Sequence, residues 1–274
     1  MSAENYARFY LPGELLRGAV KIAFSQLIGT ILTMAEMELR RLRHDPLEIV
    51  TRAIQPVLWV TVFGVVMARR VSIDVDNYIS FIAPGVVLQS ATFIALAYGI
   101  MLVFERESGI LKKLLSSPIP RASVVLGRAL AGGIRASTQY IIVLIAASLA
   151  GASLTSNILF LLLGYLVVIY VCMGFTAVSI LLVSVMKTRE RFMGIIGAVS
   201  MPLFFASNAL YPIDIMPTAI RMFALVNPIT YTVNMLRKIL LYCSLDISGE
   251  LVAVTLFFVA ATIAAIRVLD KIVE

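Results

Sequence analysis

The sequence predicts an all-α, polytopic integral membrane protein with six transmembrane helices. Three observations lead to this class. Of the 274 residues, 60% are hydrophobic and only 14% are charged, whereas a soluble domain carries roughly a quarter charged residues. Six apolar runs approach the ~20 residues that cross a bilayer as a helix. Lysines and arginines gather beside these runs, so the net charge of +7 indicates orientation in a membrane and not nucleic acid as a partner.

The first 46 residues are predicted to form a cytoplasmic segment that carries an amphipathic helix on the inner membrane surface. A short extra span over residues 19–34 is the alternative, which Lys21 and Gln26 disfavour. Asp45 and Pro46 are expected to end this helix and to begin the first span. The amphipathic pattern is typical of a helix lying among lipid headgroups, and its apolar positions recur at steps of three and four, at Ile31, Leu32, Met34, Met37, Leu39 and Leu42.

Residues 47–274 are predicted to form one transmembrane domain. Its spans cover about residues 49–68, 79–104, 134–150, 158–186, 192–209 and 251–266. The fourth run is the longest and the least interrupted. Arg52 and Gln55 interrupt the first run, and Trp59 is expected to pack within that span.

The orientation follows from the basic residues, which resist translocation and stay on the cytoplasmic side. Both termini are therefore expected in the cytoplasm, at the cell membrane. Arg128 and Arg135 precede or begin the third span, where they either reach the headgroup layer or pair with Glu105 or Glu107. With this orientation, only five of the 23 lysines and arginines fall outside, namely Arg69, Arg70, Arg221, Arg237 and Lys238.

The connection after the second span, residues 105–128, is not an ordinary loop. It reads ERESGILKKLLSSPIPRASVVLGR, in which Lys112 and Lys113 oppose an apolar face and Pro118 and Pro120 stop the helix. A short, stiff amphipathic helix is therefore expected at the cytoplasmic end. It is either an interfacial helix without a partner or a docking element for a soluble partner.

The connection between the fifth and sixth spans, residues 208–250, is too apolar for a solvated loop. Pro212, Pro217 and Pro228 divide it, so it does not form a continuous span. Irregular backbone at membrane depth is tolerated only where protein or a watery cavity covers it. We expect short helices that re-enter the outer leaflet and cap the bundle, with tyrosines at the headgroup layer.

Polar side chains inside the second and fifth spans are the candidates for a substrate pathway. Such groups normally face other helices or a cavity. The alternative to a pathway is interhelical hydrogen bonding, which contributes about 0.6 kcal/mol for each contact. The polar candidates are Gln89, Ser90, Thr92, Ser200, Ser207 and Asn208, and adaptable walls for an amphipathic substrate come from Phe93, Tyr98, Met201, Phe204 and Phe205.

No pattern in the sequence indicates catalysis or a resident metal. The only histidine, His44, has no second ligand nearby, and Cys172 and Cys243 lie far apart without metal-ligand spacing. Intramembrane hydrolases need clustered acids or histidines within the bilayer, whereas the acids here lie at span ends. The printed sequence has no G-x-x-x-x-G-K-[ST] phosphate loop.

Four stretches carry a resemblance to a known family. They are FIAPGVVLQSA, ERESGILKKLLSSPIPRASVVLGRALAG, NALYPIDIMP and LVNPITYTVNMLR. In this order and spacing they resemble the membrane subunits of ATP-binding-cassette exporters of the type-2 class. The resemblance covers about residues 43–267, and the stretch RRLRHDPLEIVTRAIQPVLWVTVFG is more similar to drug- and lipid-exporting members than to polysaccharide exporters.

The resemblance implies a partner, an assembly and two sites. Two copies would pair, and each would dock one separate ATPase that binds ATP and Mg²⁺, so this chain would need no cofactor. The pathway would follow the dimer interface, lined by the second and fifth spans. Contact with the ATPase would fall to Glu105, Arg106, Glu107, Gly109, Lys112 and Lys113, and to Arg40, Arg41 and Arg43 of the N-terminal helix.

The expected function is that of a permease subunit for ATP-driven export of amphipathic or hydrophobic compounds. Export of a lipid-linked polysaccharide is the alternative within the same class. A membrane-embedded enzyme acting on lipid and a scaffold without transport are the alternatives from other classes. Only the permease reading requires an ATPase partner.

Overall fold

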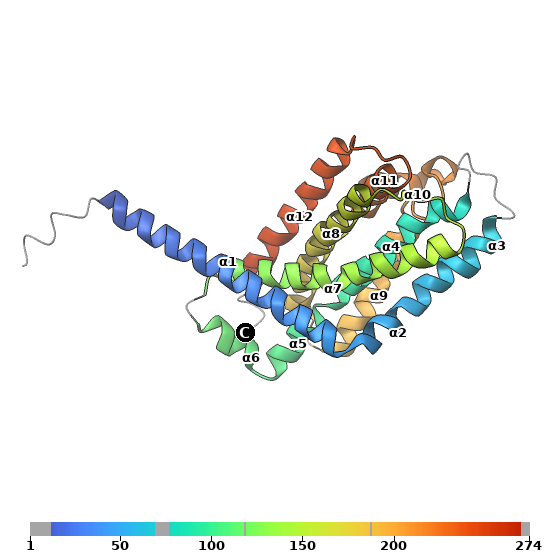
Figure 1. The fold of residues 1–274 in the computed structure, drawn as a ribbon. Coiled ribbons are helices and arrows are strands. Elements are labelled where there is room, and N and C mark those ends of the chain that lie inside the picture. The colour runs from blue at the N-terminus through green and yellow to red at the C-terminus, as the bar shows by residue number, and fades with distance from the viewer. Residues whose placement is uncertain (1–11, 69–76, 118, 187, 270–274) are drawn as a thin grey trace, which may run out of the picture.

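A computed structural model describes residues 12–68, 77–117, 119–186 and 188–269. Every regular element within these residues is a helix (Figure 1). The predicted loop between the first two spans, with Arg69 and Arg70, lies outside the described residues. So do Lys187 and both chain ends.

Helix α1 (Pro12–His44) is a long arm whose N-terminal part projects beyond the bundle and whose C-terminal part packs on α7 (Figure 1). The chain breaks at Asp45, as predicted. The carboxylate of Asp45 accepts a hydrogen bond of 3.2 Å from the amide of Glu48, and Pro46 occupies the first turn of α2. Helix α2 (Pro46–Leu58) continues through a π-helical turn, η2 (Trp59–Phe63), into α3 (Gly64–Ala68).

The predicted second span consists of two helices and leads into a third. Helix α4 (Tyr78–Ala97) is buried along nearly its whole length at the centre of the bundle. A break at Tyr98 and Gly99 separates it from α5 (Ile100–Glu107), and α6 (Ile110–Leu115) follows directly. Gly109 joins α5 to α6 with φ of +72°, in the left-handed region that side chains with a Cβ rarely adopt.

Helix α7 (Arg121–Leu149) begins well before residue 134, where we predicted the third span to start. The helix is longer than the predicted third span because the stretch before residue 134 is also helical, and Arg128 and Arg135 are both buried within it. The helix also packs closely against its neighbour. A Cβ on Gly133 would lie 2.8 Å from the carbonyl oxygen of Ile169 in α8 (Ile158–Val185), so only glycine permits this approach.

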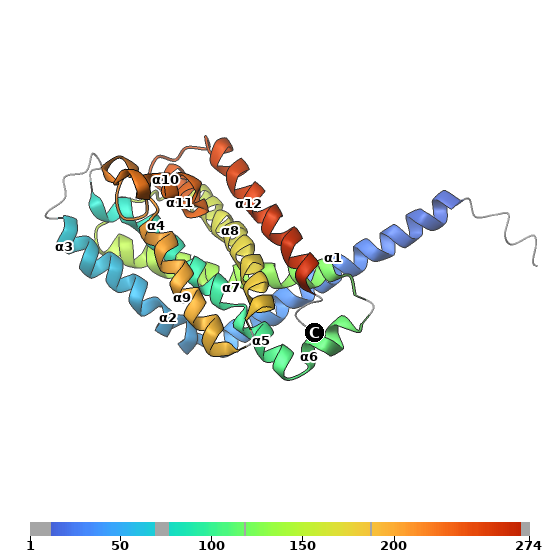
Figure 2. The same ribbon diagram turned by 180° about the vertical axis from the view of Figure 1, so that it is seen from behind.

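Helix α9 (Arg189–Phe205) runs beside α4 toward a set of short helices at the opposite end from α6 (Figure 2). These are η3 (Ile213–Ile215), α10 (Thr218–Val226) and α11 (Pro228–Leu240), before the last helix, α12 (Ser248–Val268). Each short helix begins at or directly after Pro212, Pro217 or Pro228, as the sequence predicts. Their insertion into a membrane stays a prediction.

The predicted all-α, polytopic membrane fold is confirmed. Within the described residues, five helical stretches are long and apolar enough to cross a bilayer, and they match five of the six predicted spans. Helix α9, where we placed the fifth span, has 17 residues, or ~25 Å at 1.5 Å per residue. The sixth crossing therefore stays a prediction.

Candidate functional site

The elbow formed by α5, Gly109 and α6 carries the predicted coupling residues. Lys112 and Lys113 are exposed on α6, and no described acid pairs with them. Glu105, Arg106 and Glu107, at the end of α5, differ from these lysines because the side chain of each contacts another helix.

Three consecutive side chains tie the elbow to three different helices. Glu105 forms an ion pair with Arg128 of α7. Arg106 donates hydrogen bonds of 3.2 and 2.9 Å to the carbonyl oxygens of Val183 and Met186 at the end of α8. Glu107 forms an ion pair with Arg189, the first residue of α9. A displacement of the elbow would therefore reach α7, α8 and α9 at once.

A second charged cluster joins α1, α2 and α7 beside the elbow. Arg135 of α7 forms ion pairs with Glu38 of α1 and Glu48 of α2. The side chain of Glu38 is 3% exposed, and its carboxylate also accepts a hydrogen bond of 3.2 Å from the hydroxyl of Tyr98. Arg52 bonds the other side of the Glu48 carboxylate at 3.0 Å. This cluster fixes the end of α1 to the bundle.

From the sequence, Arg128 and Arg135 either reach the headgroup layer or pair with Glu105 or Glu107. The structure shows an ion pair for each of the two arginines. Arg128 pairs with Glu105, which was one of the two alternatives. Arg135 pairs with neither Glu105 nor Glu107, and its actual partners Glu38 and Glu48 were not considered. No local pattern marks that contact, since Arg135 and Glu38 lie 97 residues apart.

The three arginines predicted at the end of α1 are all exposed. Arg40 pairs with Glu36 one turn away, with 2.6 Å between nitrogen and oxygen. Nη1 of Arg41 lies 3.2 Å from the sulfur of Met101 in α5. Arg41, Lys112 and Lys113 thus leave positive charge on the surface of this end of the molecule.

The predicted pathway residues do not form one cluster. Gln89 and Phe93 line a cavity of about 130 Å³ with Thr51 and Gln55 of α2. Tyr98 instead belongs to the charged cluster around Glu38. Thr92 is buried, and its hydroxyl has no partner among the described residues.

The other predicted pathway residues lie on α9 and just after it. Ser200, Phe204, Ser207 and Asn208 are buried, and the side-chain amide of Asn208 donates to Asn234 at 2.5 Å. Met201 is 40% exposed. The polar side chains of Ser207 and Asn208, directly after α9, are therefore bound to neighbouring backbone and to α11.

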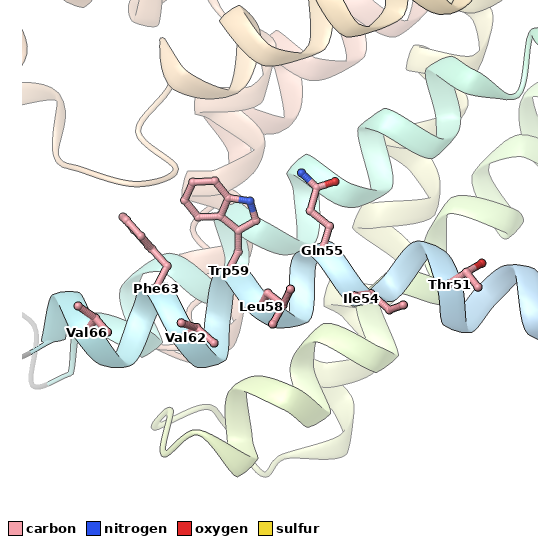
Figure 3. A pocket seen from close by; sticks show the side chains of 8 residues that line it. All are labelled: Thr51, Ile54, Gln55, Leu58, Trp59, Val62, Phe63 and Val66. Atoms are coloured by element: carbon pink, nitrogen blue, oxygen red, sulfur yellow. The ribbon is translucent and has the colours of Figure 1, made fainter.

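A concave face along α2, η2 and α3 is the feature that the sequence analysis missed (Figure 3). It is a shallow, open surface with a volume of about 740 Å³, and it is almost wholly apolar. Trp59 faces α9, with its ring centroid 6.3 Å from that of Phe204. The signal in the sequence was Thr51 and Gln55, polar residues at helical spacing in an apolar run. The lining residues are Thr51, Ile54, Gln55, Leu58, Trp59, Val62, Phe63 and Val66.

At the opposite end, Arg237 of α11 is a buried cation without a carboxylate partner among the described residues. Its guanidinium donates to the carbonyl oxygens of Phe81, Asn208 and Ala209 at 3.2, 2.6 and 3.2 Å. It also lies 3.6 Å from the ring centroid of Phe81. This residue pins the ends of α4 and α9 to α11. The neighbouring Lys238 points outward, and its hydrogen bond to Glu250 raises the pKa of the Lys238 ammonium.

The family profile described as "ABC-2 type transporter" matches residues 30–241, which include α2 to α11 and the end of α1. The chain belongs to the ABC-2 type transporter family. It is therefore a membrane permease subunit of a transporter. Family membership also implies association with an ATP-binding cassette subunit.

Curated relatives agree with this assignment. The ABC-2 permease is 28% identical to the "Putative transport permease ycf38" of Cyanophora paradoxa, over 79% of this chain and 76% of that protein. It is 29% identical to the protein of the same description in Porphyra purpurea, over 80% of this chain and 76% of that protein. A third protein of this description, from Pyropia yezoensis, is 28% identical over 73% of this chain and 69% of that protein.

Proposed function

We propose that this ABC-2 permease exports amphipathic or hydrophobic compounds, of drug or lipid-like type, across the cell membrane, driven by a separate cassette ATPase. The observation that carries the proposal is the elbow, in which Glu105, Arg106 and Glu107 bind three different helices. A partner pressing on the exposed surface of α6 would move the bundle as a unit, because buried and partly buried charge pairs resist separation.

We infer that the elbow lies in the cytoplasm, where ATP is available. Among the described lysines and arginines, only Arg221, Arg237 and Lys238 belong to the short helices at the opposite end. Lysines and arginines stay on the cytoplasmic side, which favours the α6 end as that side. Arg40, Arg41 and Arg43 would contact the ATPase beside Lys112 and Lys113. Gly109 would contribute by fixing the angle of the elbow.

Two copies of the permease would enclose the pathway between them. The face of α2 exposes Ile54, Leu58 and Val62 in a continuous stripe, which a second copy could cover. Gln89 and Phe93 border the neighbouring cavity. An apolar surface with a few polar groups suits an amphipathic substrate and adds little specificity for charge.

The proposal is tested by reconstituting the permease with a cassette ATPase that co-purifies with it. Inside-out vesicles containing both chains are expected to accumulate a fluorescent amphiphile when ATP is added. The double variant Glu105→Ala, Glu107→Ala should reach the membrane and lose accumulation, since the elbow is then released from α7 and α9.

Glu190→Ala removes an exposed acid from the same end of the molecule and serves as the matched control. It should retain accumulation. Failure of any ATPase to co-purify, together with no uptake dependent on ATP, would rule out the transport proposal.

A further inference from the structure

A cavity of about 280 Å³ lies where α1 meets the elbow and α7, away from the face of α2. Its walls are flexible and apolar, built from Met34, Met37, Met101, Ile110 and Leu114. Four charged residues also line it, namely Glu38, Arg41, Glu105 and Arg128. The cavity therefore combines a methionine-rich apolar part with a charged part, at the end of the membrane-crossing helices.

The charges around this cavity do not cancel locally. Glu38 is neutralised by Arg135, and Glu105 by Arg128. Arg41 contacts the sulfur of Met101 and forms no ion pair within the part of the chain that the structure describes. One guanidinium at the cavity thus lacks a counter-ion.

Arg128 also lines the cavity, but its guanidinium is paired with Glu105 and its Nε is buried beyond the reach of a ligand in the cavity. Arg41 is exposed at the same cavity and has no ion-pair partner among the described residues. A ligand with anionic oxygens would therefore bind through the guanidinium of Arg41.

We propose that this cavity binds the headgroup of an anionic phospholipid from the leaflet at the α6 end, with the first carbons of its chains against the methionines. The volume is below the ~300–1,000 Å³ of sites that enclose a whole drug-sized ligand. It fits a headgroup whose chains remain in the bilayer. Methionine side chains adapt to chains of varied shape.

The bound lipid would join α1 to the elbow. Met34, Met37 and Arg41 belong to α1, whereas Ile110 and Leu114 belong to α6. Lipid composition would then change how firmly α1 and α6 are held together. Lipid binding itself does not depend on the proposed transport, so it is measured on the full-length permease alone.

The test is native mass spectrometry of the permease taken from phosphatidylcholine nanodiscs and titrated with phosphatidylglycerol. We expect one phosphatidylglycerol to be retained more tightly than phosphatidylcholine. Arg41→Gln should weaken that binding about tenfold or more, as expected when one hydrogen bond to a charged group is lost. Met37→Trp, which fills the apolar part without changing a charge, should also weaken it.

Arg40→Gln and Arg43→Gln are matched controls, because they remove the same charge from the same helical end without lining the cavity. Both should bind phosphatidylglycerol as the unmodified protein does. Equal losses in all three arginine variants would show diffuse surface attraction and overturn the site. Displacement of the lipid by an equal concentration of glycerol phosphate would also overturn it, because the apolar part would then contribute nothing.

Discussion

At the scale of single residues, buried charges decide how the helices are joined at the α6 end. Arg135 lies within α7 and is held by carboxylates from α1 and α2. Its side chain is 8% exposed, and that of Glu38 is 3% exposed. Removing one member of such a cluster leaves the others charged and without a partner, which costs more than the cluster contributes as a whole.

Arg135→Gln is therefore expected to destabilise the protein by about 3 kcal/mol or more, as for other buried ion pairs that lose one partner. A lowered melting temperature of the detergent-purified permease would report this. The double variant Arg135→Gln, Glu38→Gln should recover part of the loss, because the buried carboxylate of Glu38 is then removed and Glu48 keeps Arg52 as its partner.

The control for this prediction is Arg40→Gln, which breaks an exposed pair with Glu36. Exposed pairs contribute at most about 1 kcal/mol, so its melting temperature should stay close to that of the unmodified protein. Equal effects of Arg135→Gln and Arg40→Gln would contradict the buried cluster.

Residues whose structural effect is local were predictable from the sequence, and residues with distant partners were not. Asp45 caps α2 through an amide three residues away, and Pro228 starts α11 at its own position. The partners of Arg135 and Arg237 are far away in sequence. A basic residue next to an apolar run therefore looked like an anchor at the headgroups, although the fold buries it.

At the scale of elements, the elbow depends on the backbone at Gly109. Its φ of +72° allows α6 to leave α5 at once, so that Lys112 and Lys113 are presented on the surface. The sequence predicted this short helix and also its end, because Pro118 and Pro120 follow it. The break at Tyr98 and Gly99 and the π-helical turn η2 were not predicted, because apolar runs of this kind look continuous in sequence.

Gly109→Ala is expected to destabilise the fold by about 1 kcal/mol, since alanine pays a steric penalty in the left-handed region. It should also reduce transport per ATP hydrolysed. Gly29→Ala in the exposed part of α1 should have the opposite effect on stability, a gain of up to about 1 kcal/mol, because a Cβ there meets no atom within 4 Å. Melting curves of both variants measure these changes in stability. A shift of the melting temperature in the same direction for both variants would argue against a strained elbow.

At the scale of the whole molecule, the proposed topology places α6 in the cytoplasm and the α7–α8 connection outside. Ser116 and Ser153 are both exposed, one on each side. The exposed Cys243 lies on the outer side in this topology, so labelling needs a Cys243→Ser background. The buried Cys172 can remain.

In intact cells, a membrane-impermeant maleimide should label Ser153→Cys and leave Ser116→Cys unlabelled. Disruption of the membrane should make Ser116→Cys reactive, which serves as the control for exposure. The reverse pattern in intact cells would invert the orientation and place the elbow away from ATP.

The central claim is that a motor acts through the elbow on the bundle. The pair between Glu107 and Arg189 tests it most directly, because both side chains are about 40% exposed and tolerate a change of charge. ATP-dependent uptake into vesicles should fall in Glu107→Arg and in Arg189→Glu, while ATP hydrolysis continues. The exchanged double variant should restore uptake. Equal uptake in all four proteins would contradict coupling through the elbow.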